Sequence, residues 1–596
     1  MFYFVRTVIL YLVVFCGIAL GVQWALVNYY LPSKGIVIED VSEHQTIFTM
    51  PPIEIQPRTT ETGLLLSGLM AQNRRDWGQA WQSFSKFNTK FENQPDIALR
   101  AFTLALGNGE FDEALALAEE LDAQYFSVED EETLFASYDL ARLFMVLNAI
   151  RSDDFELARA KLDTMQAEGS LARFSVPVIK EWLFPGDTIL NIDALNDVQI
   201  YYLALASEFH GNKDQAMTLM DAIKNDFSSV DQLRLFASLY HRLGEEDKAV
   251  ELIKNGAAMF AGNMEIIALE EKAEAGDFDA IALDYATFHM KSEKTGVALA
   301  FHDFARAMLG ERAVDSALLF ANMASFLDPT IPSVFVTIGE ILEIQEQEQA
   351  AMEAYEKVPS TDPQYHMAVA KRINILMQKD DYDTAYNVMN VALENDPQNP
   401  YYHYLMGDVH RAMENFPEAI KFYDMAEALG KEDGDLEREL WPLYYARAIA
   451  FDFSDRWDDA EKDLMTAIEK FPNNPVILNY LGYSYADKNI NLEKAKEMIS
   501  MALMAAPTDA YIIDSMGWIL YRMGEYKAAI RYLERAAMLR PYHMVINAHL
   551  GDAYWKVGRK LEAKYMWQRA VDYYDDTNEE QRRMIDETRR KVIEGM

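Results

Sequence analysis

Residues 516–541 read MGWILYRMGEYKAAIRYLERAAMLRP, and this stretch decides the fold. A glycine is followed by two alanines and then by a proline, at Gly517, Ala529, Ala536 and Pro541. The same small residues return with the same spacing further along the chain, at Gly551, Ala563 and Ala570. Two helices can approach closely only where a side chain is nearly absent, and proline cannot continue a helix. The spacing therefore predicts a pair of antiparallel helices that is repeated along the chain.

The period can be followed through the second half of the sequence. Alanines recur at an almost constant interval, with one clearly longer step after the fourth, at Ala317, Ala351, Ala385, Ala419, Ala460, Ala495, Ala529 and Ala563. Prolines recur at Pro329, Pro363, Pro397, Pro472, Pro507 and Pro541. This pattern resembles the tetratricopeptide-repeat (TPR) family, whose unit of about 34 residues is a helix–turn–helix. The resemblance implies an all-α fold, a right-handed superhelical solenoid, with a regular array over residues 296–577.

The two ends of this array differ from its middle. Residues 61–295 keep fragments of the period at irregular spacing, such as Gly68, Ala80 and Ala114, and we interpret them as degenerate TPR-like helical repeats. Residues 578–596 are rich in charge and predict a C-terminal capping helix, because the end of a solenoid needs a polar outer face.

Residues 1–34 predict a membrane anchor or signal segment. Arg6 is the only charged side chain before Lys34, and the stretch between them supplies the roughly 20 residues that a transmembrane helix needs. The pattern fits an uncleaved signal anchor, a cleaved secretory signal, a lipoprotein signal with Cys16 as the lipidated residue, or a buried helix. A weak positive-inside bias favours export of the body. Residues 35–60 contain three prolines and predict an extended linker.

The composition argues against several classes of function. The formal net charge of −40 repels phosphate backbones, so we expect no nucleic-acid partner. The single cysteine cannot build a disulfide framework or a thiolate metal site. The sequence lacks the nucleophile-elbow, zinc-protease, phosphate-loop and C-x-x-C motifs. We therefore expect a chain that is not an enzyme and that holds neither a cofactor nor a metal.

The resemblance also indicates where partners bind. In TPR arrays the first helix of each pair lines the concave face, and carrying the inward positions over gives an aromatic-lined groove with mixed charge. Tyr and Trp often anchor protein interfaces; the alternative is that they pack against the neighbouring helix. Trp518, Tyr521 and Trp555 are expected to form one continuous patch, and the repeats around Trp77 and Trp81 are the second choice. The candidate groove residues are Tyr401, Tyr404, Tyr445, Asn479, Tyr483, Tyr511, Trp518, Tyr521, Arg522, His549, Asp552, Trp555 and Lys556.

The whole chain, and residues 479–536 in particular, is similar to a proteobacterial family of long envelope TPR proteins. One branch comprises outer-membrane lipoproteins that are adaptors of a periplasmic C-terminal processing protease and bring it to cell-wall hydrolases. Phe15 before Cys16 departs from a lipoprotein signal, which favours an inner-membrane anchor. We expect a non-enzymatic scaffold or adaptor of the bacterial cell envelope, with its body in the periplasm and with an envelope protease or cell-wall enzymes as partners. The alternative is a cytoplasm-facing, membrane-anchored assembly factor or chaperone-like TPR protein.

Overall fold

The computed structural model describes residues 61–595, apart from residues 75, 91–94, 125–131, 166–169, 187–191, 225–229, 261–263, 279–290, 363, 432–440 and 576–578. The predicted anchor (residues 1–34) and linker (residues 35–60) lie outside the described residues. Within the described part every regular element is a helix, as the repeat pattern predicts. No helix of that part combines the length and the apolar character needed to cross a bilayer.

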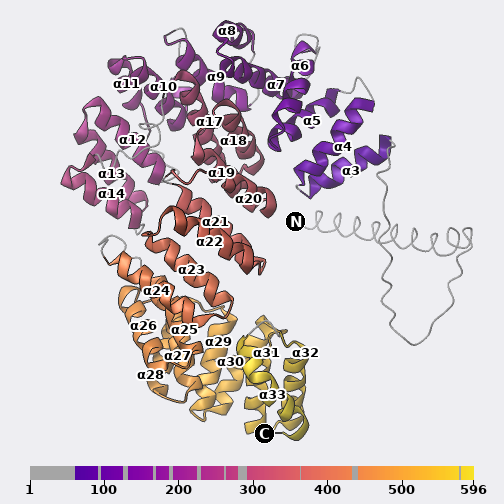
Figure 1. The fold of residues 1–596 in the computed structure, drawn as a ribbon, viewed down its shortest axis with the longest axis vertical. Helices are drawn as coiled ribbons and strands as arrows, with labels where there is room; N and C mark the ends of the chain where they lie inside the picture. The colour runs from indigo at the N-terminus through magenta and orange to yellow at the C-terminus, as the bar shows by residue number, and fades with distance from the viewer. Residues whose placement is uncertain are drawn as a thin grey trace, which may run out of the picture. The chain divides into compact units, whose positions relative to one another are not determined.

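The N-terminal helices follow one another along the chain and pack against their sequence neighbours (Figure 1). Their lengths vary more than those of the later helices, in keeping with the irregular period. They are α3 (Glu61–Asn73), α4 (Trp77–Lys90), α5 (Pro95–Gly107), α6 (Phe111–Gln124), α7 (Glu132–Arg151), α8 (Phe155–Asp163), α9 (Ser170–Leu183), the short 3-10 helix η2 (Ile192–Ala194), α10 (Asp197–Phe209), α11 (Lys213–Met220), α12 (Val230–Leu243), α13 (Glu246–Met259) and α14 (Met264–Ala275).

The later helices form eight successive pairs followed by one last helix. Each first helix packs most extensively on the second helix of its own pair. The pairs are α17 (Glu293–Gly310) with α18 (Val314–Leu327), α19 (Pro332–Ile344) with α20 (Glu348–Glu356), α21 (Tyr365–Gln378) with α22 (Tyr382–Asn395), α23 (Pro400–Ala412) with α24 (Phe416–Gly430), α25 (Trp441–Phe453) with α26 (Trp457–Lys470), α27 (Pro475–Asp487) with α28 (Leu492–Ala505), α29 (Ala510–Arg522) with α30 (Tyr526–Leu539), and α31 (Met544–Lys556) with α32 (Lys560–Asp572), before α33 (Glu579–Glu594).

The glycine of a helix pair makes room for a large side chain of the second helix. A Cβ added to Gly517 would lie 2.5 Å from Leu533 Cγ and 3.3 Å from the carbonyl oxygen of Ala529. Gly517 therefore faces the backbone of Ala529 across the helix pair, and the side chain of Leu533, one turn further along α30, fills the space above the glycine. The same sequence interval joins Gly68 to Phe84, Gly339 to Tyr355, Gly407 to Tyr423 and Gly551 to Trp567.

Turn and stop residues recur with the period. A residue between the two helices of each pair has a left-handed backbone. These residues are Arg312, Glu346, Asp380, Glu414, Asp455, Asn489, Gly524 and Gly558, of which only the last two are glycines. The predicted prolines end the second helices, because α26 ends at Lys470 and α28 at Ala505, each two residues before a proline. Repeated local signals of this kind set the helix boundaries.

The second helix of the first regular pair lies against the N-terminal helices. Every residue of α18 from Ala317 to Leu327 is buried, and α18 packs on α5 and α7. The Asn322 side-chain amide donates to the carbonyl oxygen of Gly107 at 2.8 Å, and the Phe326 ring lies 4.6 Å from that of Phe144. One apolar core therefore continues past residue 295, from the N-terminal helices into the regular array.

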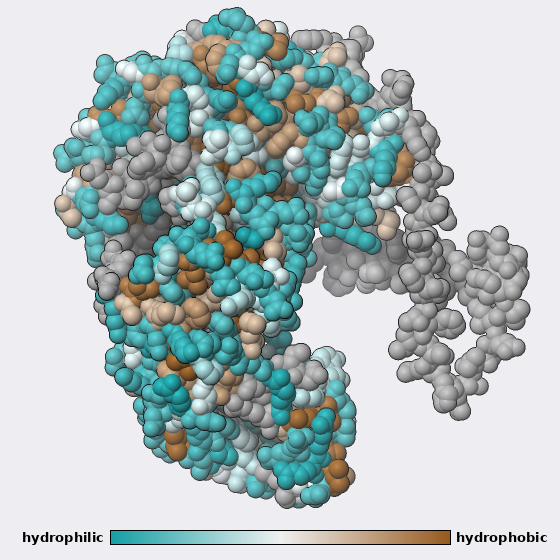
Figure 2. Space-filling view, in the orientation of Figure 1, coloured by the Kyte–Doolittle hydropathy of each residue, from teal (hydrophilic) through white to brown (hydrophobic). Residues whose placement is uncertain are grey.

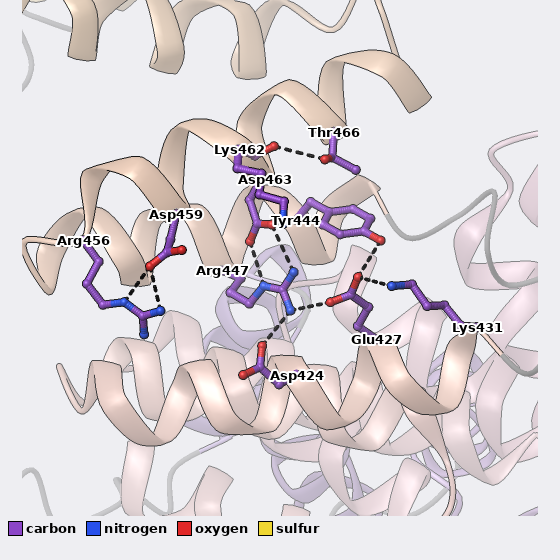
Figure 3. Close-up of polar contacts among 10 residues, drawn as sticks. All are labelled: Asp424, Glu427, Lys431, Tyr444, Arg447, Arg456, Asp459, Lys462, Asp463 and Thr466. Atoms are coloured by element: carbon purple, nitrogen blue, oxygen red, sulfur yellow. Dashed lines mark hydrogen bonds and ion pairs between the residues drawn. The ribbon is translucent and has the colours of Figure 1, made fainter.

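A buried arginine joins three consecutive helices (Figure 3). Arg447 of α25 donates from Nε and Nη2 to the two carboxylate oxygens of Asp463 on α26, at 2.7 and 3.0 Å. Its Nη1 donates to Asp424 at 2.7 Å and to Glu427 at 2.6 Å, both on α24. Burial alone would raise the pKa of Glu427, but hydrogen bonds from Lys431 and Arg447 hold that pKa at about 2. The cluster therefore ties the second helix of one repeat, α24, to both helices of the next, α25 and α26.

The last helix, α33, covers the end of the array. It packs on α32 and α31, where Ile585 joins an apolar cluster with Val545 and Ala570. The Lys591 ammonium donates to Asp552 on α31 at 2.8 Å. The face of the molecule shown in Figure 2 is mostly hydrophilic, with apolar side chains in separate areas.

Candidate functional site

The candidate groove residues lie on the first helices of five consecutive repeats, α23, α25, α27, α29 and α31. These first helices also touch one another, since α23 packs on α25, α27 on α29, and α29 on α31. Among the aromatic candidates, Tyr401 and Tyr511 are the most open, with 38% and 46% of their surface exposed. Tyr404, Tyr445, Asn479 and Tyr483 are partly exposed. The structure therefore brings the predicted residues into a row across adjacent repeats.

On α23 the row begins with two stacked tyrosines. The rings of Tyr401 and Tyr404 are 6.1 Å apart. Beneath them Asp408 accepts hydrogen bonds from the Tyr423 hydroxyl at 2.7 Å and from Arg411 at 3.1 Å. Burial raises the pKa of Tyr404, with a further contribution from the Asp408 charge. A hydrogen bond from the Tyr404 hydroxyl to Asp408 acts in the same direction, so this hydroxyl is held protonated and tied to the carboxylate beneath it.

The middle of the row contains a tyrosine that the positional rule missed. Tyr480 of α27 meets Tyr445 of α25 edge to face, with ring centroids 5.7 Å apart. Its hydroxyl donates to Asp452 at 3.2 Å, and Lys488 pairs with the same carboxylate at 3.0 Å. The rule counts only residues that point straight inward. Tyr480 points toward the preceding first helix, and a rule that included such residues would have found it.

Trp518 and Tyr521 are not the exposed anchors that the sequence predicted. Each is only 7% exposed. Trp518 is sandwiched between Tyr521, at 4.8 Å, and His549 of α31, at 4.0 Å, with near-parallel rings. His549 is fixed in turn by a contact of 2.9 Å from its Nδ1 to Asp514. The next first helix covers these aromatic faces, so this part of the prediction is corrected from groove surface to packing between repeats.

Trp555 belongs to a different contact and does not extend that stack as predicted. Its ring lies 5.2 Å from Trp567 and 3.4 Å from the Lys560 ammonium. Asp552 is buried and accepts from the Trp567 indole at 2.7 Å. Lys556 is exposed. The residues of α31 therefore support the end of the array, because α33 and Trp567 occupy the space beside them.

Arg522 forms hydrogen bonds with the C-terminal end of a neighbouring helix, α27. Its guanidinium donates to the carbonyl oxygens of Ala486, at 2.8 Å, and of Asp487, at 2.5 Å. These carbonyls lie at the end of α27, where the last residues of a helix lack internal partners. Arg522 thus links α29 to α27 along the row and is positioned for packing rather than for direct contact with a partner.

Trp77 and Trp81, the second-choice site, both pack against the apolar core, Trp77 as a buried and Trp81 as a partly buried side chain. Trp77 is 7% exposed, and its ring covers Gly107, where an added Cβ would lie 2.1 Å from the ring. Trp81 is packed against the same core. In the same part of the chain, α18 lies on α5 and α7 and covers part of these two helices.

Within the described ranges no three His, Cys, Asp or Glu side chains are grouped so that they could hold a metal ion. The row offers tyrosine hydroxyls, one amide and several carboxylates that are mostly engaged with neighbouring side chains. Such an arrangement can bind a peptide by stacking and hydrogen bonding.

Comparison with known proteins agrees with the repeat assignment. Tetratricopeptide-repeat models match residues 371–433 and 511–543. A TPR repeat-containing protein of Pseudomonas aeruginosa is 30% identical over 223 residues, which make up 37% of this chain and 36% of that protein. The match thus spans little more than a third of the length of that relative.

Three solved structures show how this chain compares with other helical arrays. The APC/C hetero-tetramer Cut9–Hcn1 is 14% identical with a TM-score of 0.34, covering 77% of this chain and 96% of that one. Yeast Tom70 is 15% identical with a TM-score of 0.29, covering 89% and 95%. YrrB, a TPR protein with an unusual peptide-binding site, is 15% identical with a TM-score of 0.25, covering 33% and 97%.

Because these scores are all below 0.5, the fold assignment rests on the repeat models and on the chain's own helices. Helix pairs of the same period lie before, between and after the two matched stretches, from α19 to α32. The chain is therefore a tetratricopeptide-repeat protein.

Proposed function

We propose that this chain is a non-enzymatic scaffold that binds an extended segment of another protein along α23, α25, α27 and α29. The observation that carries the proposal is the row of open or partly open tyrosines on successive first helices: Tyr401, Tyr404, Tyr445, Tyr483 and Tyr511. Tyrosine offers a large apolar ring and a hydroxyl and loses little conformational entropy on binding. A side chain of this type repeated from helix to helix suits a linear ligand.

The spacing of the row indicates the length of the segment. Packed helices lie roughly 8–10 Å apart, and an extended chain advances about 3.3 Å per residue. A bound segment would therefore meet a new first helix about every third residue. About ten residues would pass the four helices, a length that a disordered tail or linker of a partner can supply.

The two most open tyrosines provide a direct test. The double variant Tyr401→Ser with Tyr511→Ser should weaken the affinity for a partner isolated with the full chain by at least about tenfold, since aromatic anchors commonly contribute about 1–2 kcal/mol each. Its melting temperature should stay close to that of the wild type, because both rings are open. The matched control is Tyr542→Ser with Tyr565→Ser, two tyrosines that are 68% and 64% exposed and lie outside the first helices. Loss of affinity only in the control would overturn the proposal.

The place of this scaffold in the cell is a further part of the proposal. The uncharged stretch between Arg6 and Lys34 supports a membrane anchor with the body in the periplasm, where an envelope protease or cell-wall enzymes would be the partners. A phosphatase fused after Met596 should then be active, and a reporter that works only in the cytoplasm should be silent. The reverse pattern would favour the alternative, a cytoplasm-facing assembly factor.

A further inference from the structure

Three buried polar atoms on the proposed binding face have no hydrogen-bond partner among the described residues. They are Asn479 Oδ1 on α27, and Asp514 Oδ1 and Trp518 Nε1 on α29. Native proteins leave few buried polar atoms in this condition, because an unmade hydrogen bond is unfavourable. Two acceptors and one donor at neighbouring positions of adjacent repeats therefore call for an explanation.

The register of the helices places these atoms together. Asn479 and Tyr483 are four residues apart on α27, and Asp514 and Trp518 are four apart on α29, so each pair shares one helix face. The two helices pack directly on each other. His549 of α31 joins the group, with its Nδ1 2.9 Å from Asp514 Oδ2 and its ring 4.0 Å from Trp518 and 6.2 Å from Tyr483. Asn479 and Tyr483 are partly exposed and form the open side of the cluster.

Two arginines near this cluster donate or pack elsewhere, although the Arg522 guanidinium also lies over the Trp518 ring, 5.5 Å from its centroid. Arg522 donates to the carbonyl oxygens of Ala486 and Asp487, and the Arg540 guanidinium lies over Tyr511, 5.8 Å from its ring centroid. The second carboxylate oxygen of Asp514 is thus left for a donor that the described residues do not supply.

The chemistry of the three atoms selects the ligand. A cationic side chain can donate to both oxygens at once, and the carbonyl oxygen of a peptide can accept from the Trp518 indole. A metal ion could not accept that hydrogen bond, and a phosphate or carboxylate would be repelled by Asp514. The net charge of −40 also attracts basic segments. A guanidinium fits best, since its planar fork presents several donors with fixed geometry.

We infer that Asn479, Asp514 and Trp518 form a subsite for a basic side chain, preferentially arginine, of the bound segment. This inference rests on the proposed function and adds the partner's chemistry to it: the segment carries an arginine or lysine that is inserted between α27 and α29 while its backbone passes Trp518. Tyr483 and His549 form the walls of the subsite.

The test uses a small probe and the full-length chain. N-acetyl-arginine methylamide and its citrulline counterpart have nearly the same shape, but only the first is cationic. Each is titrated into protein carrying ¹⁵N-labelled tryptophan, and the Trp518 indole signal is identified with Trp518→Phe. We expect the arginine probe to shift that signal in a saturable way, with a dissociation constant at least about tenfold lower than that of the citrulline probe, because hydrogen bonds to charged groups are the stronger ones.

Variants separate the subsite from general electrostatics. Asp514→Asn keeps the shape of the side chain and should remove most of the preference for arginine over citrulline. Asn479→Asp adds a carboxylate and should increase that preference. Because the two variants are expected to act in opposite directions, a folding defect in one of them could not produce both results. The control Asp586→Asn removes one charge at a side chain that is 90% exposed on α33 and should change nothing.

Two outcomes would overturn the inference. Equal binding of both probes would show that charge is not recognised, and an unmoved Trp518 signal would show that the three atoms are satisfied by buried water alone. Either result leaves the proposed function standing if Tyr401→Ser with Tyr511→Ser still weakens partner binding.

Discussion

Replacing Gly551 by alanine tests how closely the two helices of a repeat must approach. The added Cβ would lie 2.4 Å from Trp567 Cδ1, 2.5 Å from its Nε1 and 3.1 Å from the carbonyl oxygen of Ala563. Trp567 is fully buried, and its indole donates to Asp552 at 2.7 Å, so the ring cannot move without breaking that hydrogen bond.

The expected change in the free energy of unfolding is the sum of two destabilising terms and one stabilising term. Overpacking typically costs about 1–3 kcal/mol, and a weakened buried hydrogen bond costs about 1 kcal/mol more. The better helix propensity of alanine returns about 1 kcal/mol. We therefore expect the free energy of unfolding of the last repeats to fall by about 2 kcal/mol for Gly551→Ala. The matched control is Gly310→Ala, at the end of α17, where an added Cβ meets nothing within 4 Å; it should be neutral or slightly stabilising.

Hydrogen exchange measured by mass spectrometry reads the effect helix by helix. Repeats couple mainly to their neighbours, so faster exchange in Gly551→Ala should be confined to α29 through α33. Uniform loosening of the whole chain, or a variant as stable as the wild type, would refute the close-packing account.

Three further predictions concern other parts of the array. Glu346 is exposed with a left-handed backbone of φ 61°, so Glu346→Gly should stabilise the chain by up to about 1 kcal/mol, measured as a rise in melting temperature; a fall would contradict the assignment of strain to this turn. The folded-state pKa of Glu427 is lowered to about 2 from 4.5, so its contribution to stability is present above pH 4.5 and is lost as the pH falls toward 2. The melting temperature of Glu427→Gln should accordingly depend less on pH across that window than that of the wild type. Asn322→Ala leaves the buried carbonyl of Gly107 without its donor, which should cost about 1–3 kcal/mol and speed hydrogen exchange in both α5 and α18; an effect in α18 alone would argue against the link between the two halves.

The repeat could be predicted from the sequence because its signals are local. Small residues, prolines and their constant spacing each act within one helix pair, and the structure keeps them in the predicted register, as Gly517 and Ala529 show. The side chain that fills the space above the glycine could not be predicted in this way, since the direction of Leu533 depends on the tilt between two helices and not on spacing alone.

The candidate site could be predicted only in part. The open tyrosines Tyr401 and Tyr511 follow from position within the repeat. The burial of Trp518 and Tyr521 does not, because it depends on His549 from the next repeat and on a ring stack between repeats. The packing of α18 against α5 and α7 is a contact between residues far apart in the chain (Asn322 with Gly107), and no periodic pattern in the sequence reports such a contact.

The most direct measurement of the central claim is site-specific photocross-linking of the full-length chain to its partner. Benzoyl-phenylalanine is placed at Tyr401 or Tyr511 on the proposed binding face, or at Met538 or Leu561, which are 82% and 84% exposed on second helices. Binding along the first helices predicts partner adducts from Tyr401 and Tyr511 and none from Met538 and Leu561. Adducts from Met538 or Leu561, with none from the two tyrosines, would place the partner on the opposite face and contradict the account.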